Sequence, residues 1–239
     1  QFLWNERGTI LHATFISILV TALGIILSVL LTTTMGYVVS RNTYKLKSFY
    51  TWVIFIPMIF NGGMLAGYVV NTNILHLRNS IWALILPLAV SPFNIVICKT
   101  FFKTTIPDSI VESAKIDGAG HTKIFFQITF PLGKPILVTM GLFSALAYWN
   151  DWTNGLYYLS GNEGQKLYSI QNLLNQMITD IQYLASGKVT GNIGAEVAKL
   201  PTTSIRMAIA FIAMLPLFII YPFLQKYFAE GITLGAVKG

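Results

Sequence analysis

Five long apolar runs, separated by polar segments, constrain this chain more than any other feature of its sequence. The runs cover residues 12–40, 49–70, 80–102, 135–159 and 204–228. About 20 consecutive apolar residues are enough for a helix to span a bilayer. Only 10% of the residues are charged, whereas soluble domains usually carry about 25%. The sequence therefore predicts an all-α polytopic membrane protein, with residues 1–239 forming one transmembrane domain of five visible spans. A soluble all-α protein is the weaker alternative.

Proline and glycine interrupt two of these runs. Pro57 and the Gly62-Gly63 pair lie in the second run, and Pro87 and Ser91-Pro92 lie in the third. A broken helix survives in a membrane only where neighbouring protein or a water-filled cavity satisfies the freed backbone groups. We therefore expect these spans to face other helices or a path through the protein.

The basic residues predict the orientation of the chain, because cytoplasmic loops carry an excess of Lys and Arg. Nine lie in the set of segments made of the 41–47 loop, the 103–134 segment and the C-terminal end, against six in the other set. The sequence thus places the first set in the cytoplasm and residues 160–203 in an extracellular loop. Five spans with an external start indicate that the full chain has six, with the first one missing here.

Residues 103–134 form a polar module between the third and fourth runs. Ser109 and Glu112 are spaced as a capping box, which predicts the start of a short helix. Gly118 is expected to end that helix in a tight turn that needs no side chain. Thr122 is placed to cap a second short helix, and Pro131 then redirects the chain. The alternative without a specific function is an amphipathic connector lying along the membrane surface.

The spacing of residues in this module resembles a known signature. Glu112-Ser113-Ala114, then Gly118, then Ile128-Thr129-Phe130-Pro131 is similar to the E-A-A-x3-G-x9-I-x-L-P pattern of ABC importer permeases. The extended form, with Asp117-Gly118-Ala119 and Pro135, resembles the carbohydrate-uptake branch, the maltose-type or type I importers, and in particular the oligosaccharide permeases of Gram-positive bacteria. Ser113 stands where the pattern has Ala, and Phe130 where it has Leu.

The resemblance implies a permease subunit of an ATP-driven carbohydrate importer in a bacterial plasma membrane. In that family the path is formed with a second homologous permease, two ATPase subunits carry ATP and Mg, and an extracellular solute-binding protein delivers the sugar to the loop at 160–203. The first short helix of the module would dock on an ATPase subunit. By resemblance, that coupling contact falls on Glu112, Ser113, Ala114, Asp117, Gly118 and Ala119.

A second polar and aromatic cluster ends the fourth run. Aromatic faces stack on sugar rings, while amide and carboxylate groups bond to hydroxyls, so we predict that this cluster lines a translocation path. The predicted path residues are Asn94, Trp149, Asn150, Asp151, Trp152 and Asn154. The alternatives are an aromatic belt at the membrane interface for the cluster and a helix–helix hydrogen bond for Asn94.

Motifs for chemistry are absent from the sequence. There is no G-x-x-x-x-G-K-[ST] phosphate loop and no H-E-x-x-H pair, so we expect no catalytic residues, no metal site and no cofactor on this chain. The net charge of +7 comes mainly from loops between spans and does not indicate nucleic-acid binding. A self-contained secondary transporter is the main alternative, although buried acids and an internal repeat, which such proteins use, are not evident. A membrane-embedded enzyme is the other alternative, and no sugar can be named from the sequence.

Overall fold

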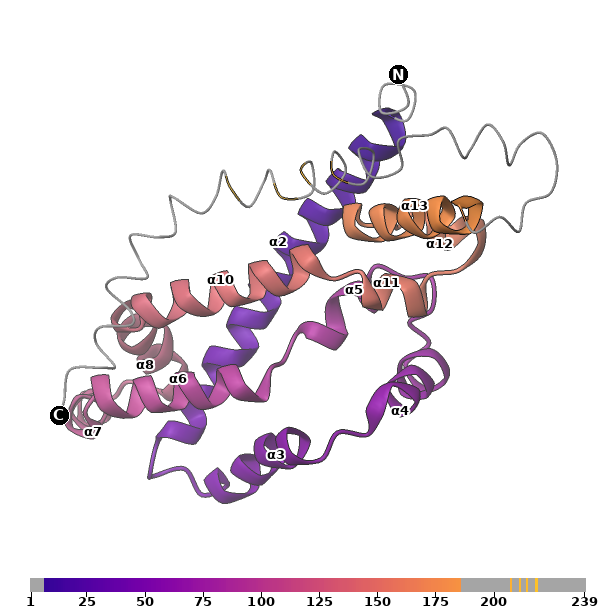
Figure 1. Ribbon diagram of the computed structural model, residues 1–239. Coiled ribbons are helices and arrows are strands. Elements are labelled where there is room, and N and C mark those ends of the chain that lie inside the picture. Colours follow the sequence, from indigo (N-terminus) through magenta and orange to yellow (C-terminus); the bar gives the residue numbers. More distant parts are fainter. Residues whose placement is uncertain (1–6, 186–206, 208–210, 212–213, 215–217, 219–239) are drawn as a thin grey trace.

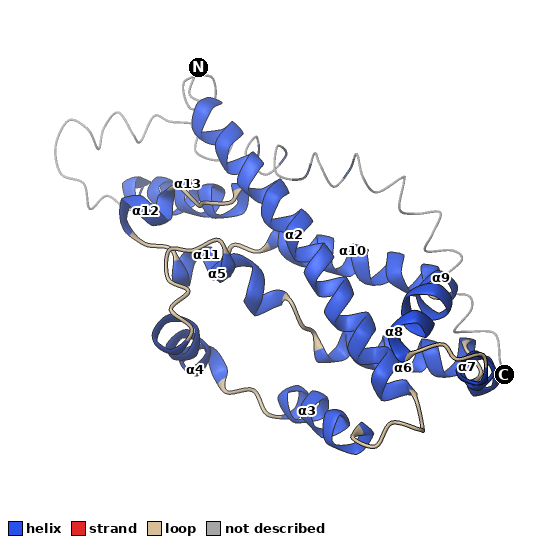
Figure 2. Cartoon of the chain, turned by 180° about the vertical axis from the view of Figure 1, so that it is seen from behind, coloured by secondary structure: helices blue, strands red, loops and turns tan. Residues whose placement is uncertain are grey.

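The computed structural model describes residues 7–185 together with Met207, Phe211, Met214 and Phe218 (Figure 1). Every regular element in this part of the chain is helical, and Figure 2 shows the helices joined by loops without a strand. The predicted all-α class is therefore confirmed for the described residues. Most of the fifth predicted span, the 160–203 loop beyond residue 185 and the C-terminal tail lie outside them.

The first apolar run forms α2 (Arg7–Ser40), an unbroken helix of 34 residues that crosses the middle of the molecule (Figure 1). No proline interrupts it, and the hydroxyls of Thr33 and Thr34 donate to the carbonyls one turn back at 2.6 Å. Among the described helices only Gly8–Ser40 is by itself long and apolar enough to cross a membrane. At 1.5 Å per residue it exceeds the bilayer core of about 30 Å, so it tilts or projects.

Glycine brings α2 close to two other helices, α6 (Pro92–Thr105) and α10 (Lys134–Asn150). A Cβ at Gly24 would lie 2.5 Å from the ring of Tyr148 on α10. A Cβ at Gly36 would lie 2.6 Å from that of Cys98 on α6. Small residues of this kind let membrane helices approach each other closely. The polar contact between α2 and α10 is a 2.9 Å hydrogen bond joining the hydroxyls of Ser144 and Ser28.

The second apolar run is divided at the predicted Gly62-Gly63 pair, whereas the helix continues through Pro57. Helix α3 (Lys47–Ile59) contains Pro57 in its last turn. Helix α4 (Gly63–Val69) starts at Gly63 with a positive φ of 77° and runs on into a π-helical turn, η1 (Val70–Ile74). Several large apolar side chains of α3 are exposed, among them Phe49, Trp52, Ile56 and Ile59. Such a surface is typical of contact with lipid or another subunit.

The third apolar run is also broken, and a neighbouring helix satisfies the break. It comprises α5 (Trp82–Ile85), a 3₁₀ turn η2 (Leu86–Leu88) and α6, bent by 50°. The backbone N–H of Ala89 bonds to Leu86, three residues back, as in a 3₁₀ turn. The hydroxyl of Tyr148 on α10 donates to the Ile85 carbonyl at 2.8 Å. This is the support from packed protein that an intramembrane break requires.

The fourth apolar run forms α10 and, after a turn, α11 (Thr153–Tyr158). Counting each bent pair of helices as one span gives up to three spans among the described residues, and the count of five stays a prediction. The described part of the 160–203 segment forms α12 (Gly161–Gln165) and α13 (Ile170–Ala185). Helix α13 packs against α2 and α10 through a buried cluster of Ala13, Trp149, Ile170, Leu173 and Leu174.

Candidate functional site

The polar module folds into short helices, as predicted, but its caps differ from the prediction. The first helix, α7 (Asp108–Ile116), starts after Pro107, whose φ of −57° suits a helix entry, and no side chain caps it. The capping box predicted for Ser109 and Glu112 is therefore wrong, because Ser109 already lies inside the first turn. The second helix, α8 (His121–Ile124), starts after Gly120, so Thr122 is not its cap either.

The turn between these helices is set by Gly118. Its φ is +78°, which only glycine adopts without strain, and α7 ends beside it at Ile116. After α8 the chain continues through a π-helical turn, η3 (Phe125–Thr129), and α9 (Phe130–Leu132) into α10. The expected tight glycine turn is confirmed.

The inner face of the module packs on the ends of the long helices. Val111 and Ala114 of α7 join a buried cluster with Tyr37 of α2 and Phe102 of α6. Phe125 belongs to this cluster as well. Its neighbour Phe126 does not, since 51% of its surface is exposed. The module is thus packed against the ends of α2 and α6 through a shared buried cluster.

Most of the predicted coupling residues are exposed on α7 or in the turn that follows it. Glu112, Ser113, Asp117 and Gly118 are exposed, whereas Ala119 is half-buried. Ala114 is only 8% exposed and points into the protein, so it supports the outer face of α7 rather than forming part of it.

The sequence reasoning missed the most exposed apolar side chain of the module. Ile116, at the end of α7, is 86% exposed. In the sequence Ile116 stands between Lys115 and Asp117, and this context does not indicate its exposure. In the structure no described residue covers it.

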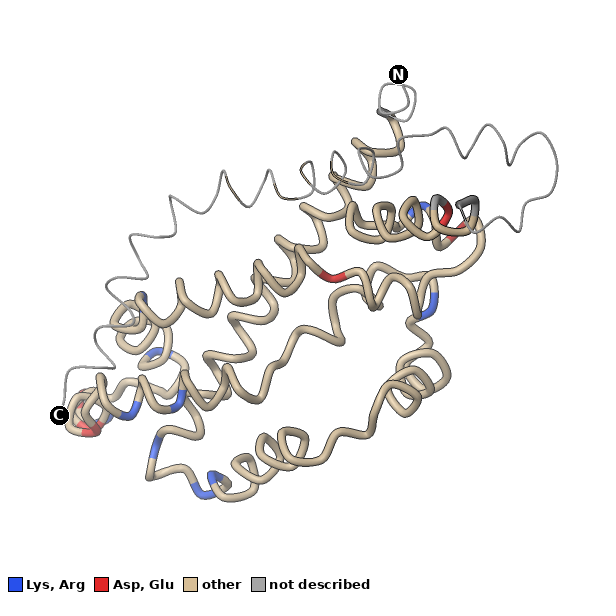
Figure 3. The backbone as a smooth tube through the Cα atoms, in the orientation of Figure 1, with Lys and Arg blue, Asp and Glu red and all other residues tan. Residues whose placement is uncertain are grey.

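Charge is unevenly distributed along the molecule. Figure 3 shows most Lys and Arg segments of the described chain gathered at the end that carries α7, together with acidic segments of α7 itself. The apolar helices extend away from this end. The arrangement matches the excess of basic residues expected on the cytoplasmic side of a membrane protein.

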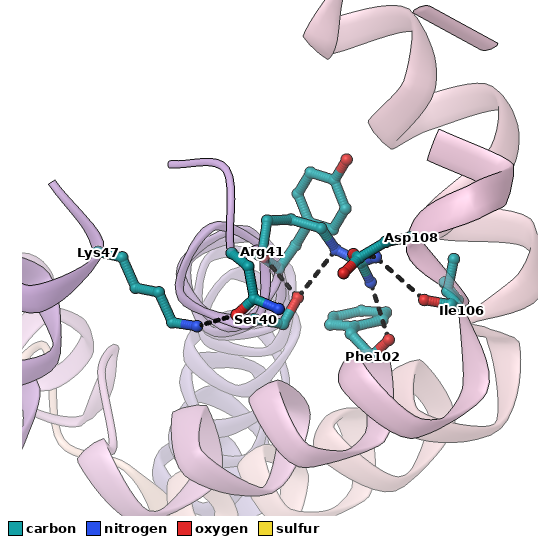
Figure 4. A network of polar contacts seen from close by, with 8 residues as sticks. Ser40, Arg41, Lys47, Phe102, Ile106 and Asp108 are labelled. Atoms are coloured by element: carbon teal, nitrogen blue, oxygen red, sulfur yellow. Dashed lines mark hydrogen bonds and ion pairs between the residues drawn. The ribbon is translucent and has the colours of Figure 1, made fainter. Parts of the chain in front are cut away.

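Arg41 is a second residue whose role the sequence did not reveal. In the sequence Arg41 is one of several cations in the 41–47 loop. In the structure it is only 6% exposed, and its guanidinium lies between the end of α2 and the start of α7 (Figure 4). Its ion pair with Asp108 measures 3.0 Å. The two residues are 67 positions apart, and no local pattern joins them.

The predicted path residues at the end of α10 and in the turn after it are only partly exposed. Trp149 is buried in the cluster with α13, while Asn150 is exposed and donates to the Leu146 carbonyl at 2.9 Å. The Asp151 carboxylate accepts bonds from the backbone of Thr153 at 3.1 Å and from the side chain of Asn154 at 2.8 Å. Asp151 and Asn154 therefore shape the turn into α11.

The two remaining predicted path residues belong to different elements: Trp152 directly precedes α11, and Asn94 lies in α6. Trp152 is 43% exposed. Asn94 is half-buried in the first turn of α6, where its backbone N–H donates to Ser91 Oγ at 3.5 Å. Within the described residues Asn94 makes no hydrogen bond to the cluster at 149–154.

Two buried polar residues that the sequence did not single out hold this turn in place. Asn172 of α13 donates to the carbonyl of Trp152 at 2.6 Å. Its amide oxygen accepts the hydroxyl of Ser169 at 2.7 Å. The turn after α10 is thus fixed to the 160–185 lobe. As for metals, the described residues contain no group of three or more His, Cys, Asp or Glu side chains placed to hold an ion.

Helices with apolar surfaces, a basic end and an exposed short helix at that end are features of the membrane component of a transport system. The chain belongs to the family described as the binding-protein-dependent transport system inner membrane component, which it matches over residues 11–234.

Relatives agree with this membership. The chain is 37% identical to Protein LplC of Bacillus subtilis, over 97% of this chain and 75% of that protein. It is 38% identical to the B. subtilis polygalacturonan/rhamnogalacturonan transport system permease protein YtcP, over 94% and 76% of the two chains. The arabinooligosaccharides transport system permease protein AraQ of the same organism is 30% identical, over 100% of this chain and 77% of that one.

A solved structure shares the fold. It is a bacterial ABC transporter involved in the import of the acidic polysaccharide alginate, with a TM-score of 0.77 and 24% identity, over 92% of this chain and 75% of that chain.

Proposed function

We propose that the chain is a permease subunit of an ATP-driven bacterial importer of oligosaccharides. The observation that carries the proposal is the outer face of α7, a charged and small-residue surface held on the ends of the long helices at the basic end of a family member. The substrate class rests on relatives named for sugar-polymer and oligosaccharide transport. The self-contained secondary transporter has no support from the relatives.

In this proposal α7 is a cytoplasmic coupling helix. Glu112, Ser113, Asp117 and Gly118 contact a groove on an ATPase subunit, and Ile116 inserts into it as an apolar anchor. Ala114 and Ala119 act from behind by fixing α7 to the buried cluster. The chain lies in the plasma membrane with the five predicted spans, and lipid contacts its exposed apolar helices.

The partners follow from the family's mode of transport. A second homologous permease completes the path, two ATPase subunits bind ATP and Mg and perform the hydrolysis, and an extracellular solute-binding protein delivers the sugar to the lobe formed by α12 and α13. This chain itself is no enzyme. ATP and the loaded binding protein drive the change of state because each binds one state better than the other.

Within the path, the proposal gives different roles to the predicted residues. Asn150 and Trp152, which are exposed, contact the sugar directly. Asp151 and Asn154 set the turn that presents them, and Trp149 fixes that turn on α13. Asn94 faces the path from α6.

Reconstitution tests the proposal. The chain is purified in mild detergent with whatever binds it and incorporated into liposomes with the solute-binding protein. We expect co-purified ATPase subunits and oligosaccharide uptake that requires internal ATP. Uptake driven by an ion gradient in liposomes that hold this chain and no ATPase would support the secondary transporter instead.

A further inference from the structure

The guanidinium of Arg41 joins three elements at the basic end of the molecule. Arg41 follows the last residue of α2, and its Nε donates to Ser40 Oγ at 3.2 Å. Its Nη2 donates to the Phe102 carbonyl at 2.8 Å, and its Nη1 donates to the Ile106 carbonyl and to Asp108 Oδ1, both at 3.0 Å (Figure 4). Four of the five N–H groups of a guanidinium are thus used in fixed directions.

The two carbonyl acceptors lie at the C-terminal end of a helix, which the helix dipole makes negative. The Phe102 carbonyl already accepts the Ile106 N–H at 3.2 Å, so Arg41 is its second donor. Phe102 and Ile106 lie at the end of α6, so Arg41 caps α6 with a positive charge that comes from α2. The ring of Tyr37, 5.2 Å from the guanidinium carbon, supports the same position from α2.

The carbonyl bonds carry more of this contact than the ion pair does. The Asp108 side chain is 49% exposed, so water and salt weaken its attraction to Arg41. The contacts to Phe102 and Ile106 are buried, and a buried charge left without partners is costly. Lysine cannot replace this arrangement, since one ammonium lacks the planar fork of donors.

We propose that Arg41 is a positioning residue that makes the end of α2, the end of α6 and the start of α7 one rigid unit. The covalent chain connects α7 only to α6 and, through the module, to α10. The buried cluster of Tyr37, Val111 and Ala114 already packs α2 against α7, and Arg41 adds directed polar bonds that hold the two helices in one orientation. This inference rests on the proposed function, since it says how motion of the coupling helix reaches the helix that crosses the molecule.

Transport and ATP hydrolysis are measured together on the complete importer in liposomes. We expect Arg41→Lys to leave the complex assembled and hydrolysing ATP, while the amount of sugar imported per ATP falls about tenfold, because a loosened contact transmits less of the motion. Asp108→Asn keeps the carbonyl bonds and should stay within about twofold of the wild type. Lys47→Gln is the matched control, since Lys47 is a nearby cation at the start of α3 whose ammonium bonds, among the described residues, only to Asn42 Oδ1, at 2.6 Å.

A distance measurement tests the rigid unit even if an Arg41 variant fails to assemble. In a Cys98→Ala background, spin labels are placed at Ile26 on α2, 67% exposed, and at Ser109 on α7. We expect one narrow distance distribution, the same without nucleotide and with trapped ATP, and a broad one in Arg41→Lys.

The outcomes separate the two claims. If the wild-type assembly shows no ATP-dependent uptake, the proposed function fails. If the wild type transports and Arg41→Lys imports as much sugar per ATP, the inference about Arg41 is overturned. A wild-type distance that changes when ATP binds overturns it as well.

Discussion

At the scale of single residues, Gly118 offers the sharpest test of the coupling module. Its φ is +78° and a Cβ there would meet nothing within 4 Å, so only the backbone conformation opposes a side chain. A non-glycine residue in this region costs roughly 1–2 kcal/mol. We expect Gly118→Leu to insert and assemble while its ATP hydrolysis no longer drives uptake, as measured by sugar import and phosphate release on the same liposomes. Undiminished uptake would contradict the account.

Gly120 supplies the matched control for this substitution. A Cβ at Gly120 also meets nothing within 4 Å, but its φ of −70° suits any residue. Gly120→Ala should therefore transport like the wild type, whereas Gly118→Ala should not. Gly118→Asn should recover part of the activity, because asparagine tolerates the left-handed region better than alanine does.

Ile116 leads to a second prediction at this scale. Its side chain is 86% exposed, so Ile116→Ser should leave the fold of the chain intact. If Ile116 anchors α7 in the ATPase groove, its loss should weaken ATPase binding by at least about tenfold, or ~1.4 kcal/mol. Titration of purified ATPase onto the permease measures this affinity. Leu132→Ser, at a site 48% exposed elsewhere in the module, is the control, and equal affinities for both variants would remove Ile116 from the contact.

At the scale of elements, the close approach of α2 to α6 leads to a prediction about stability. A Cβ at Gly36 would lie 2.6 Å from Cys98 Cβ and 3.2 Å from the Lys99 backbone nitrogen. The two helices would have to separate, and overpacking of this kind costs typically about 1–3 kcal/mol. Gly36→Ala should lower the thermal unfolding midpoint of the purified protein. Gly141→Ala, whose Cβ would meet its nearest neighbour at 3.8 Å, should not.

The sequence predicted elements well where one run of residues decides them. The apolar run without proline predicted α2, and Gly63 and the proline at 87 predicted breaks in the next two runs, whereas α3 continues through Pro57. The start of α7 was misjudged, because Pro107 sets the first turn without help from the Ser109 hydroxyl. The partner of the broken third run, Tyr148, lies 63 positions from Ile85, and no local pattern indicates such a contact.

At the scale of the whole molecule, hydropathy and the signature at 112–131 predicted the class of protein. They did not predict the contacts that join helices distant in sequence. The sequence predicts that Arg41 lies in a cytoplasmic loop, which is consistent with the basic end in Figure 3. Its link to Asp108 exists only once α2, α6 and α7 are folded together. Asn172 supports the turn at Trp152 in the same way, from 20 positions away.

The central claim is that force from an ATPase subunit enters this chain at α7, and a cross-link at Ser113 tests it most directly. Ser113 is exposed on the outer face of α7. In the assembled importer, with the buried Cys98 replaced by alanine, Ser113→Cys should form a disulfide with a cysteine placed in the ATPase groove. That bond should stop uptake until it is reduced. Labelling of this cysteine only from the outside of intact cells, or ATP-driven uptake that persists with the bond formed, would contradict the account.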